Sequence, residues 1–350
     1  MTSVDTNALN GTKKILVVGP SWVGDMVMAQ SLFIALKNTR PDCRIDVLAP
    51  SWTLSLLERM PEVTKAIAMP LPRGKLGLME RIRLGKSLRS EGYDQAILLP
   101  NSWKSAIPPF FANIPIRTGH IGECRWGLLN DARRLDKKLL TMTVQRFVAL
   151  GLPVDASMPP VCPKPVITIS KDRQQVVIDK FKLTPSVKTL ALCPGAEYGP
   201  AKRWPTEYYA EVARQKIDQG WQVWLFGSDK DKADAAQINK ETSGLCTDFT
   251  GRTSMAEAVD LMSLANTVVT NDSGLMHVAA ALDKKIIAIY GSSDPGFTPP
   301  LNDKAQIISL NLDCAPCFKR ECPLGHTHCL TGITPDRVLE LITLTQSGPK

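Results

Sequence analysis

The feature that most constrains the fold is an alternation of short apolar runs with longer stretches of helical spacing. Each run is rich in apolar residues and leads into a glycine or a proline, and eight of them occur at 13–19, 44–50, 63–70, 93–100, 189–195, 221–227, 267–274 and 285–291. Strands that alternate with helices over short connections are typical of a parallel sheet covered by helices. The sequence therefore predicts an α/β protein.

A proline-rich segment divides this alternation into two halves. Residues 153–165 contain five prolines, and such a segment is extended and suits a linker between domains. A chain of 350 residues is also long for one hydrophobic core. We therefore predict two doubly wound, Rossmann-like domains facing a cleft, residues 1–163 and 164–350, with the last helix packing back on the first domain. Ligands of such sheets bind at the carboxyl ends of the strands.

Charge and hydropathy narrow the class of partner. The formal net charge of +8 favours anionic ligands, but lysine and arginine are scattered and form no block typical of a nucleic-acid-binding tail. No apolar stretch approaches the ~18 residues of a membrane span. Residues 1–13 are polar and lack the apolar core of a signal peptide. We expect a cytoplasmic protein that binds no nucleic acid and begins with a polar lead-in.

The segment GPSWVGDM, residues 19–26, has the glycine spacing of a phosphate-binding loop but carries Asp25 after its second glycine. A phosphate-binding loop has lysine at that point, and a carboxylate there repels phosphate. The start of the following helix stabilises the negative charge. Asp25 is therefore a candidate general base. The alternative is a charge at a helix start that takes no part in chemistry.

The segment CPGAEYGPAKRWP, residues 193–205, follows a predicted strand and combines a glycine-rich turn with Lys202 and Arg203. Backbone N–H groups and a lysine at such a turn favour a diphosphate site, to which Gly195 and Ala196 belong as turn residues. A solvated basic loop is the alternative.

The segment TNDSGLMHVAAAL, residues 270–282, places Asp272, Ser273 and Gly274 between a strand and a helix that carries His277. The N–H groups of Ser273 and Gly274 and the serine hydroxyl are suited to phosphate oxygens. Two simpler readings remain: Asp272 or Ser273 as an ordinary helix cap, and His277 as a packed core residue.

Two further motifs carry possible metal chemistry. Asp229 and Asp231 form an Asp-x-Asp pair after a strand, for which a charged helix start is the preferred interpretation. The cysteine-rich segment 314–329 contains Cys314, Cys317, Cys322 and Cys329. Its Cys-x-x-Cys start has the spacing of a structural zinc site, and a reduced or redox-labile loop is the alternative. We place this segment away from the other motifs and assign it no part in catalysis.

Taken together, GPSWVGDMVMAQSL, LLPNSWKSA, CPGAEYGPAKRWP and TNDSGLMHVAAAL resemble the ADP-heptose:lipopolysaccharide heptosyltransferases of glycosyltransferase family 9. The likeness runs from about Lys13 to the C-terminal helix and is strongest to the branch that adds the second core heptose. It implies a GT-B fold and an inverting transfer that needs no metal or other cofactor. It also implies ADP-L-glycero-D-manno-heptose as donor and a lipid A–Kdo–heptose acceptor.

The resemblance also implies roles for residues. Asp25 deprotonates the acceptor hydroxyl and Lys202 neutralises the departing ADP diphosphate. The donor pocket is lined by Gly195, Ala196, Lys202, Asp272, Ser273, Gly274 and His277. The charges agree with such a reaction, because attack by a hydroxyl needs a base and loss of ADP needs positive charge.

Acceptor recognition is expected at the first domain. The candidate residues are Ser21, Trp22, Asn101, Lys104, Arg117 and Arg125, whose cations suit the acidic sugars and phosphates of the inner core. Solvated surface residues are the alternative. Apolar side chains of residues 71–85 are expected to contact the anionic surface of the inner membrane.

Other functions remain open at this point: transfer to another core position, a different sugar-nucleotide transferase or epimerase, and a non-catalytic anion-binding protein. No G-x-G-x-x-G follows the first predicted strand, which argues against an epimerase with a bound dinucleotide. A non-catalytic protein leaves Asp25 unexplained.

Overall fold

The structure is a computed structural model that describes residues 13–72, 74–184 and 186–344, so the predicted lead-in lies almost entirely outside the described residues. The chain divides into two compact units, Met1–Pro165 and Val166–Lys350. The division falls at the end of the proline-rich segment.

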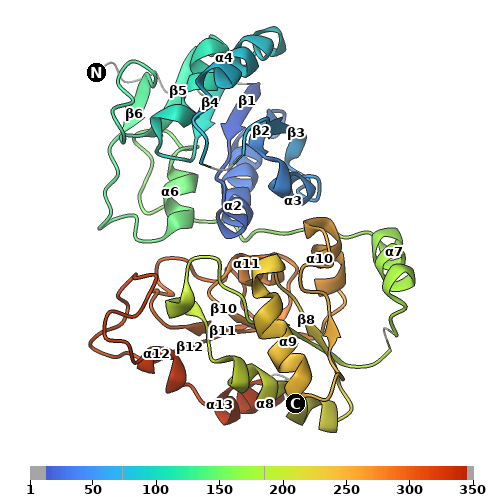
Figure 1. Ribbon diagram of the computed structural model, residues 1–350. Coiled ribbons are helices and arrows are strands. Elements are labelled where there is room, and N and C mark those ends of the chain that lie inside the picture. Colours follow the sequence, from blue (N-terminus) through green and yellow to red (C-terminus); the bar gives the residue numbers. More distant parts are fainter. Residues whose placement is uncertain (1–12, 73, 185, 345–350) are drawn as a thin grey trace. The chain divides into compact units, whose positions relative to one another are not determined.

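The first unit is a six-stranded parallel sheet with helices on it (Figure 1). Its strands are β1 (Lys14–Val18), β2 (Arg44–Pro50), β3 (Val63–Met69), β4 (Gln95–Leu98), β5 (Ile116–His120) and β6 (Asp131–Arg133). Its α-helices are α2 (Val23–Thr39), α3 (Leu54–Leu57), α4 (Leu78–Ser87), α5 (Ile107–Phe111) and α6 (Thr143–Ala149). Short 3-10 turns lie at Ser51–Thr53, Arg89–Glu91 and Trp103–Ser105.

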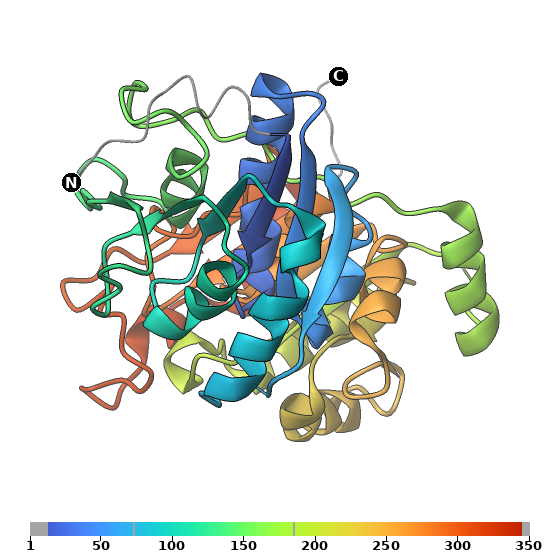
Figure 2. The same cartoon turned by 90° about the horizontal axis from the view of Figure 1, so that it is seen from above.

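The strand order of the first sheet is β3-β2-β1-β4-β5-β6. Figure 2 looks down on this unit, with β1 (dark blue) inside the sheet and β3 (light blue) at an edge. Ile15, Leu16 and Val17 of β1 have no exposed surface, because a central parallel strand is covered on both faces. That double burial explains why the run is continuously apolar.

The second unit repeats the design with strands β7 (Thr189–Cys193), β8 (Gln222–Leu225), β9 (Thr247–Asp248), β10 (Thr267–Asn271), β11 (Lys285–Tyr290) and β12 (Ala305–Ser309). Its α-helices are α7 (Lys171–Phe181), α8 (Thr206–Asp218), α9 (Lys232–Glu241), α10 (Met255–Met262), α11 (Gly274–Ala281), α12 (His328–Thr331) and α13 (Pro335–Leu344). Two 3-10 turns lie at Pro200–Lys202 and Asp229–Asp231. The strands are parallel in the order β12-β11-β10-β7-β8-β9.

Both sheets therefore have the order 3-2-1-4-5-6 when each is numbered from its own first strand. This is the order of a doubly wound, Rossmann-like fold, in which the strand order reverses between the first and fourth strands. Two such units make a GT-B-like α/β protein, which confirms the predicted fold class.

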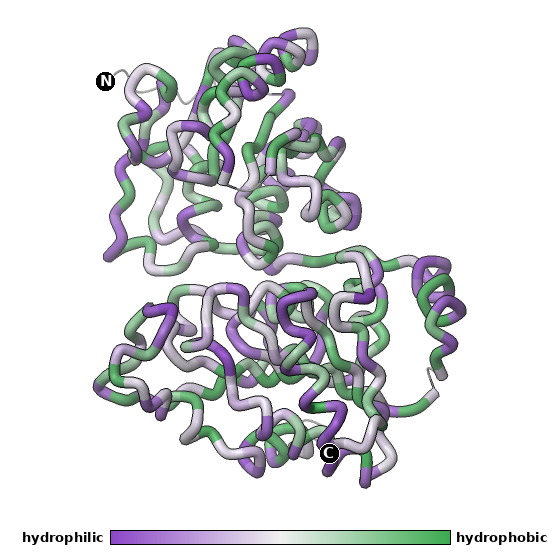
Figure 3. The backbone as a smooth tube through the Cα atoms, in the orientation of Figure 1, coloured by the Kyte–Doolittle hydropathy of each residue, from purple (hydrophilic) through white to green (hydrophobic). Residues whose placement is uncertain are grey.

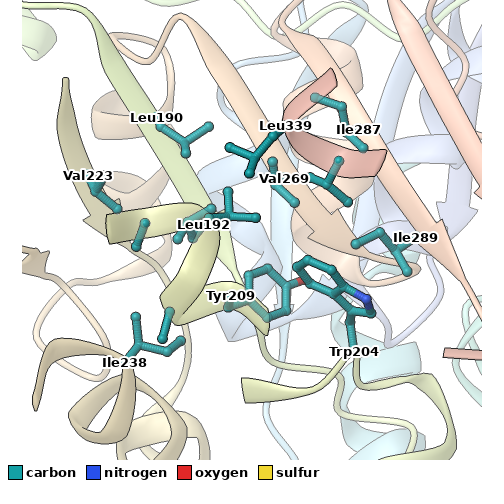
Figure 4. Packing of buried hydrophobic residues seen from close by; sticks show 14 of the residues in the cluster. Leu190, Leu192, Trp204, Tyr209, Val223, Ile238, Val269, Ile287, Ile289 and Leu339 are labelled. Carbon is teal, nitrogen blue, oxygen red and sulfur yellow. The ribbon is translucent and has the colours of Figure 1, made fainter. Parts of the chain in front are cut away.

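The core of the second unit is built around β7, β10, β11 and the helices on one face of the sheet. Trp204 and Tyr209 lie edge to face with ring centroids 4.9 Å apart (Figure 4). Helix α13 packs against α8 (Figure 1), and its Val338 and Ile342 join this core. The last helix thus packs on the core of its own unit, and its predicted packing on the first domain stays a prediction.

Candidate active site

The candidate donor residues lie at the carboxyl edge of the second sheet, where its strand order reverses. Strands β7 and β10 are neighbours that flank this reversal. The turn 194–203 follows β7 and Asp272 follows β10. Since ligands of doubly wound sheets bind outside the carboxyl ends at the reversal point, the structure brings two separate sequence motifs to the position that favours a ligand.

Asn271, the last residue of β10, joins the two motifs. Its side chain is buried, and its Oδ1 accepts hydrogen bonds from the Trp204 backbone N–H at 3.0 Å and the Tyr209 hydroxyl at 3.1 Å. Its Nδ2 donates to the Pro194 carbonyl at 2.7 Å. Because these bonds are buried, losing them would leave polar groups unpaired. Asn271 was not predicted from the sequence, although a polar residue at the end of a buried apolar strand is a signal that indicates it.

Lys202 ends a 3-10 turn and forms an ion pair with Asp272 of the other motif. Both side chains are mostly buried, at 16% and 5% exposed. The lysine ammonium also lies 5.1 Å from the centre of the Tyr198 ring. A cation held on two sides in this way is preorganised to meet an anionic group.

Close packing explains the glycine at position 195. A Cβ built on Gly195 would lie 2.5 Å from the Asp231 carboxyl carbon, so only glycine lets the turn approach that carboxylate. Asp231 accepts hydrogen bonds from the Ser228 N–H at 2.8 Å and from Arg203 at 3.2 Å. Asp231 thus caps the start of a helix and, through Arg203, fixes the turn 194–203. Asp229, the other member of the Asp-x-Asp pair, forms an ion pair with Lys232 at 2.7 Å. These contacts support the helix-start interpretation of the pair.

Helix α11 begins at Gly274, with Ser273 as its N-cap residue. The Ser273 side chain makes no capping hydrogen bond to the helix and instead lies 3.3 Å from the Thr270 hydroxyl. His277, one turn into the helix, is only 5% exposed. Burial is the largest cause that lowers the pKa of His277 to about 4, and Lys202 lowers it further against the opposing effect of Asp272. The imidazole is therefore neutral at physiological pH.

The first unit presents Asp25 at the equivalent position of its own sheet. The segment 19–22 follows β1, the strand that flanks the order reversal, and Asp25 lies half-buried in the first turn of α2. Gly19 donates its N–H to the Leu48 carbonyl at 2.9 Å, and a Cβ at Gly19 would lie 2.6 Å from the Met26 methyl carbon. Ser21 and Trp22 are exposed on the same loop.

The loop after β4 lies beside it, because β4 pairs with β1. This loop carries Asn101 and Lys104. Arg125 is buried and donates to the Pro100 carbonyl at 2.8 Å and to Asn101 Oδ1 at 3.4 Å. Arg117 is placed differently: it lies near the amino end of β5, and its guanidinium donates to the Leu128 and Ile114 carbonyls at 2.7 and 2.6 Å. The structure thus brings Asn101 and Arg125 together but does not bring Arg117 to this edge.

A cavity of about 620 Å³ opens near the carboxyl ends of β5 and β6. Its lining includes His120, Arg125, Arg133 and Arg134, together with the exposed Trp126. Burial lowers the pKa of both His120 and Arg125. Two carboxylates, Asp131 and Asp136, also line the cavity, and Asp131 pairs with Arg133 at 2.8 Å. Of the basic and aromatic lining residues, only Arg125 was predicted from the sequence.

Within 13–72, 74–184 and 186–344, no three histidine, cysteine, aspartate or glutamate side chains form a group that could hold a metal ion. Over the same ranges no helix is both long enough and apolar enough to cross a membrane.

The fold and the motifs at both sheet edges define a glycosyltransferase of the GT-B type. Residues 81–328 match glycosyltransferase family 9 (heptosyltransferase), and the chain belongs to this family. The match confirms the enzyme class and the family predicted from the sequence.

Individual relatives agree with the predicted branch. The chain is 49% identical over 336 residues to lipopolysaccharide heptosyltransferase 2 of Salmonella typhimurium, covering 93% of this chain and 97% of that protein. It resembles the structure of ADP-heptose lipopolysaccharide heptosyltransferase II of Escherichia coli with a TM-score of 0.84 and 44% identity, over 95% and 98% of the two chains. A family 9 glycosyl transferase of Veillonella parvula, 20% identical, shares the fold with a TM-score of 0.84 and coverage of 99% and 100%.

Proposed function

We propose that the chain transfers L-glycero-D-manno-heptose from ADP-heptose to a heptosyl-Kdo2-lipid A acceptor, which adds the second heptose of the lipopolysaccharide inner core. The observation that carries this proposal is the near full-length likeness to heptosyltransferases of type 2. The two sheet edges supply the groups that the reaction needs.

The donor is assigned to the second unit. Lys202 faces the diphosphate, with Gly195 and Ala196 in the turn beside it, and the N–H groups of Ser273 and Gly274 at the start of α11 add further donors. Asp272 holds Lys202 and accepts hydrogen bonds from heptose hydroxyls. The neutral His277 is buried in α11 and lines the donor pocket from the side of this helix.

The acceptor is assigned to the first unit. Asp25 accepts the proton of the attacking hydroxyl while that oxygen forms a bond to the anomeric carbon of the donor heptose. The bond from this carbon to the diphosphate oxygen breaks on the opposite face, so the configuration inverts. The electron pair leaves with ADP, whose charge Lys202 stabilises. These steps need no metal or other cofactor.

Residues around the first sheet edge recognise the acceptor in this proposal. Ser21 and Trp22 flank Asp25, and Asn101 and Lys104 follow the neighbouring strand. The basic cavity beside Arg125 is suited to the carboxylates and phosphates of the inner core. Arg117 stays a prediction without support from its position.

Membrane contact is proposed through one amphipathic surface of the first unit, which we call the α4 patch: Leu76, Leu78, Met79 and Trp103, all exposed. Figure 3 shows that α4 carries both hydrophobic and hydrophilic residues. The buried Arg81 donates to the Leu76 carbonyl at 2.6 Å and the Lys104 carbonyl at 3.5 Å, which holds the two parts of the patch together. Exposed cations occur in the same stretch of chain, at Lys75, Arg83, Lys86 and Arg89. Exposed apolar side chains accompanied by cations suit the anionic cytoplasmic face of the inner membrane.

The test is a panel of three acceptors: Kdo2-lipid A with no heptose, one heptose and two heptoses. With ADP-heptose as donor, the proposal expects rapid release of ADP and product only with the one-heptose acceptor. Faster turnover of the acceptor without heptose, or of the one with two, would assign the chain to another position of the core.

A further inference from the structure

The cysteine-rich segment 314–329 packs directly on the turn 194–203, which we call the donor turn. This is contrary to the expectation that the segment lies apart from the other motifs. The Ala201 N–H donates to the Arg320 carbonyl at 3.0 Å, and the Tyr198 hydroxyl donates to the Phe318 carbonyl at 2.7 Å. A Cβ at Gly199 would lie 2.5 Å from the Arg320 carbonyl oxygen. The position of the residues next to Lys202 therefore depends on the conformation of this segment.

The segment 314–329 is also connected to Lys202 through the ring of Tyr198. The Arg320 guanidinium carbon lies 5.3 Å and the Lys202 ammonium 5.1 Å from the centre of the Tyr198 ring. Arg320 sits between Cys317 and Cys322 in the chain. The segment that carries these cysteines and the cation Lys202 therefore contact the same aromatic ring.

Four thiols of this segment share one small cavity of about 20 Å³, lined by Cys314, Cys317, Cys322 and Cys329 together with Ser292 and Ala201. All four cysteines are free thiols. The volume suffices for a molecule the size of water. The buried Ser292 hydroxyl has no hydrogen-bond partner among the described residues, so it can bind a small polar guest such as water or hydrogen peroxide.

Two of these cysteines have pKa values that shift in opposite directions. Backbone N–H groups, with Thr327 the strongest contributor, lower the pKa of Cys322, which raises its thiolate fraction. Burial, followed by the charges of the three other cysteines, raises the pKa of Cys329. Thiolates are the form that attacks oxidants. The cavity thus places a thiol of lowered pKa beside three other thiols.

We propose that Cys322 and the three thiols sharing its cavity form a peroxide-sensitive site, in which oxidation links Cys322 to a neighbour and weakens nucleoside diphosphate binding at the donor turn. The effect on binding rests on the proposed function, because it takes Lys202 as the diphosphate ligand.

The chemistry balances with hydrogen peroxide as oxidant. The Cys322 thiolate attacks one peroxide oxygen, the O–O bond breaks, and hydroxide leaves and is protonated to water. The resulting sulfenic acid is attacked by Cys314, Cys317 or Cys329. An S–S bond forms, the S–O bond breaks, and the oxygen leaves as a second water. Two thiols are oxidised and one peroxide is reduced.

The experiment compares the reduced full-length protein with the same protein after a short exposure to hydrogen peroxide. Peptide mass spectrometry should find a disulfide that contains Cys322, and calorimetry should show ADP affinity reduced by roughly tenfold, a usual size for coupling between sites. Dithiothreitol should reduce the disulfide and restore the ADP affinity.

Two variants serve as test and control. The Cys322→Ser variant should keep its ADP affinity after peroxide, whereas Cys124→Ser, which removes an exposed thiol from the first unit, should respond as wild type does.

Three results would overturn the inference: no disulfide at Cys322, a disulfide without a change in ADP affinity, or stoichiometric zinc that keeps the thiols unreactive in the purified protein. A Lys202→Met variant in reduced form separates this inference from the donor assignment. If that variant binds ADP as tightly as wild type while the disulfide still forms in peroxide, the donor assignment has failed and the thiol chemistry stands.

Discussion

Single polar side chains connect the loops at the carboxyl edge of the second sheet, where the donor is proposed to bind. Asn271 makes three hydrogen bonds that bind the turn after β7 to the end of β10, and Asp272 holds Lys202. These side chains satisfy buried polar groups and also fix the distance between two motifs that are about 70 residues apart in the chain. Lys202 and Asp272 were predicted from their turns. Asn271 was not predicted, although its place at the end of a buried apolar strand is a signal in the sequence.

His277 gives a residue-scale prediction about stability and pH. Its imidazole takes up a proton near pH 6.5 when the chain is unfolded but only at about pH 4 when folded, so acid favours unfolding between these values. Relative to a His277→Gln variant, the wild-type free energy of unfolding should fall by up to about 3 kcal/mol between pH 7 and pH 4.

Urea unfolding at several pH values measures this difference. Parallel stability curves for wild type and His277→Gln over that range would contradict the assigned neutral state.

At the scale of elements, most predicted strands are buried and most missed strands lie at sheet edges; the edge strand β3, which was predicted, is the exception. The eight runs predicted as strands correspond to β1 to β4, β7, β8, β10 and β11, most of which are covered on both faces and hence apolar throughout. The four missed strands are β5, β6, β9 and β12. Strand β5 contains Arg117, and β9 has only two residues, so neither shows a continuous apolar run. Strands β6, β9 and β12 lie at or beside the sheet edges, where less burial is required.

The turns at the site could be predicted from the sequence because close packing there requires particular residue types. Glycine and proline mark the segments 19–26 and 193–205 because the backbone there makes approaches that a side chain would block, as at Gly19 and Gly195. What these turns touch was not predictable. The contact of segment 314–329 with Ala201 depends on tertiary packing, and the spacing of its cysteines alone left it without a place in the site.

At the scale of the whole molecule, two units with the same strand order divide the work of the proposed reaction. Each presents its functional loops where its own sheet reverses strand order, the first with a carboxylate and the second with a lysine. This proposed division assigns the acceptor and the donor to different units, and the α4 patch lies on the unit proposed to bind the lipid-linked acceptor.

The α4 patch gives a prediction at this scale. A Leu78→Ser/Met79→Ser double variant loses two exposed apolar side chains, so it should sediment several-fold less with vesicles that contain anionic phospholipid. Its ADP affinity should stay at the wild-type value, because the donor unit is untouched. As a control, a Val161→Ser variant removes an exposed apolar residue outside the patch and should sediment as wild type does. Equal vesicle binding by all three proteins would remove the proposed membrane contact.

Heptose transfer and ADP binding by Asp25→Asn and Lys202→Met test the proposed roles of base and donor site. Asp25→Asn should lower kcat by about 100-fold or more, since it removes a general base, while ADP affinity is unchanged. Lys202→Met should weaken ADP binding and lower turnover together. Near wild-type kcat in Asp25→Asn, or lost ADP affinity in that variant, would contradict the assignment of base and donor site to separate units.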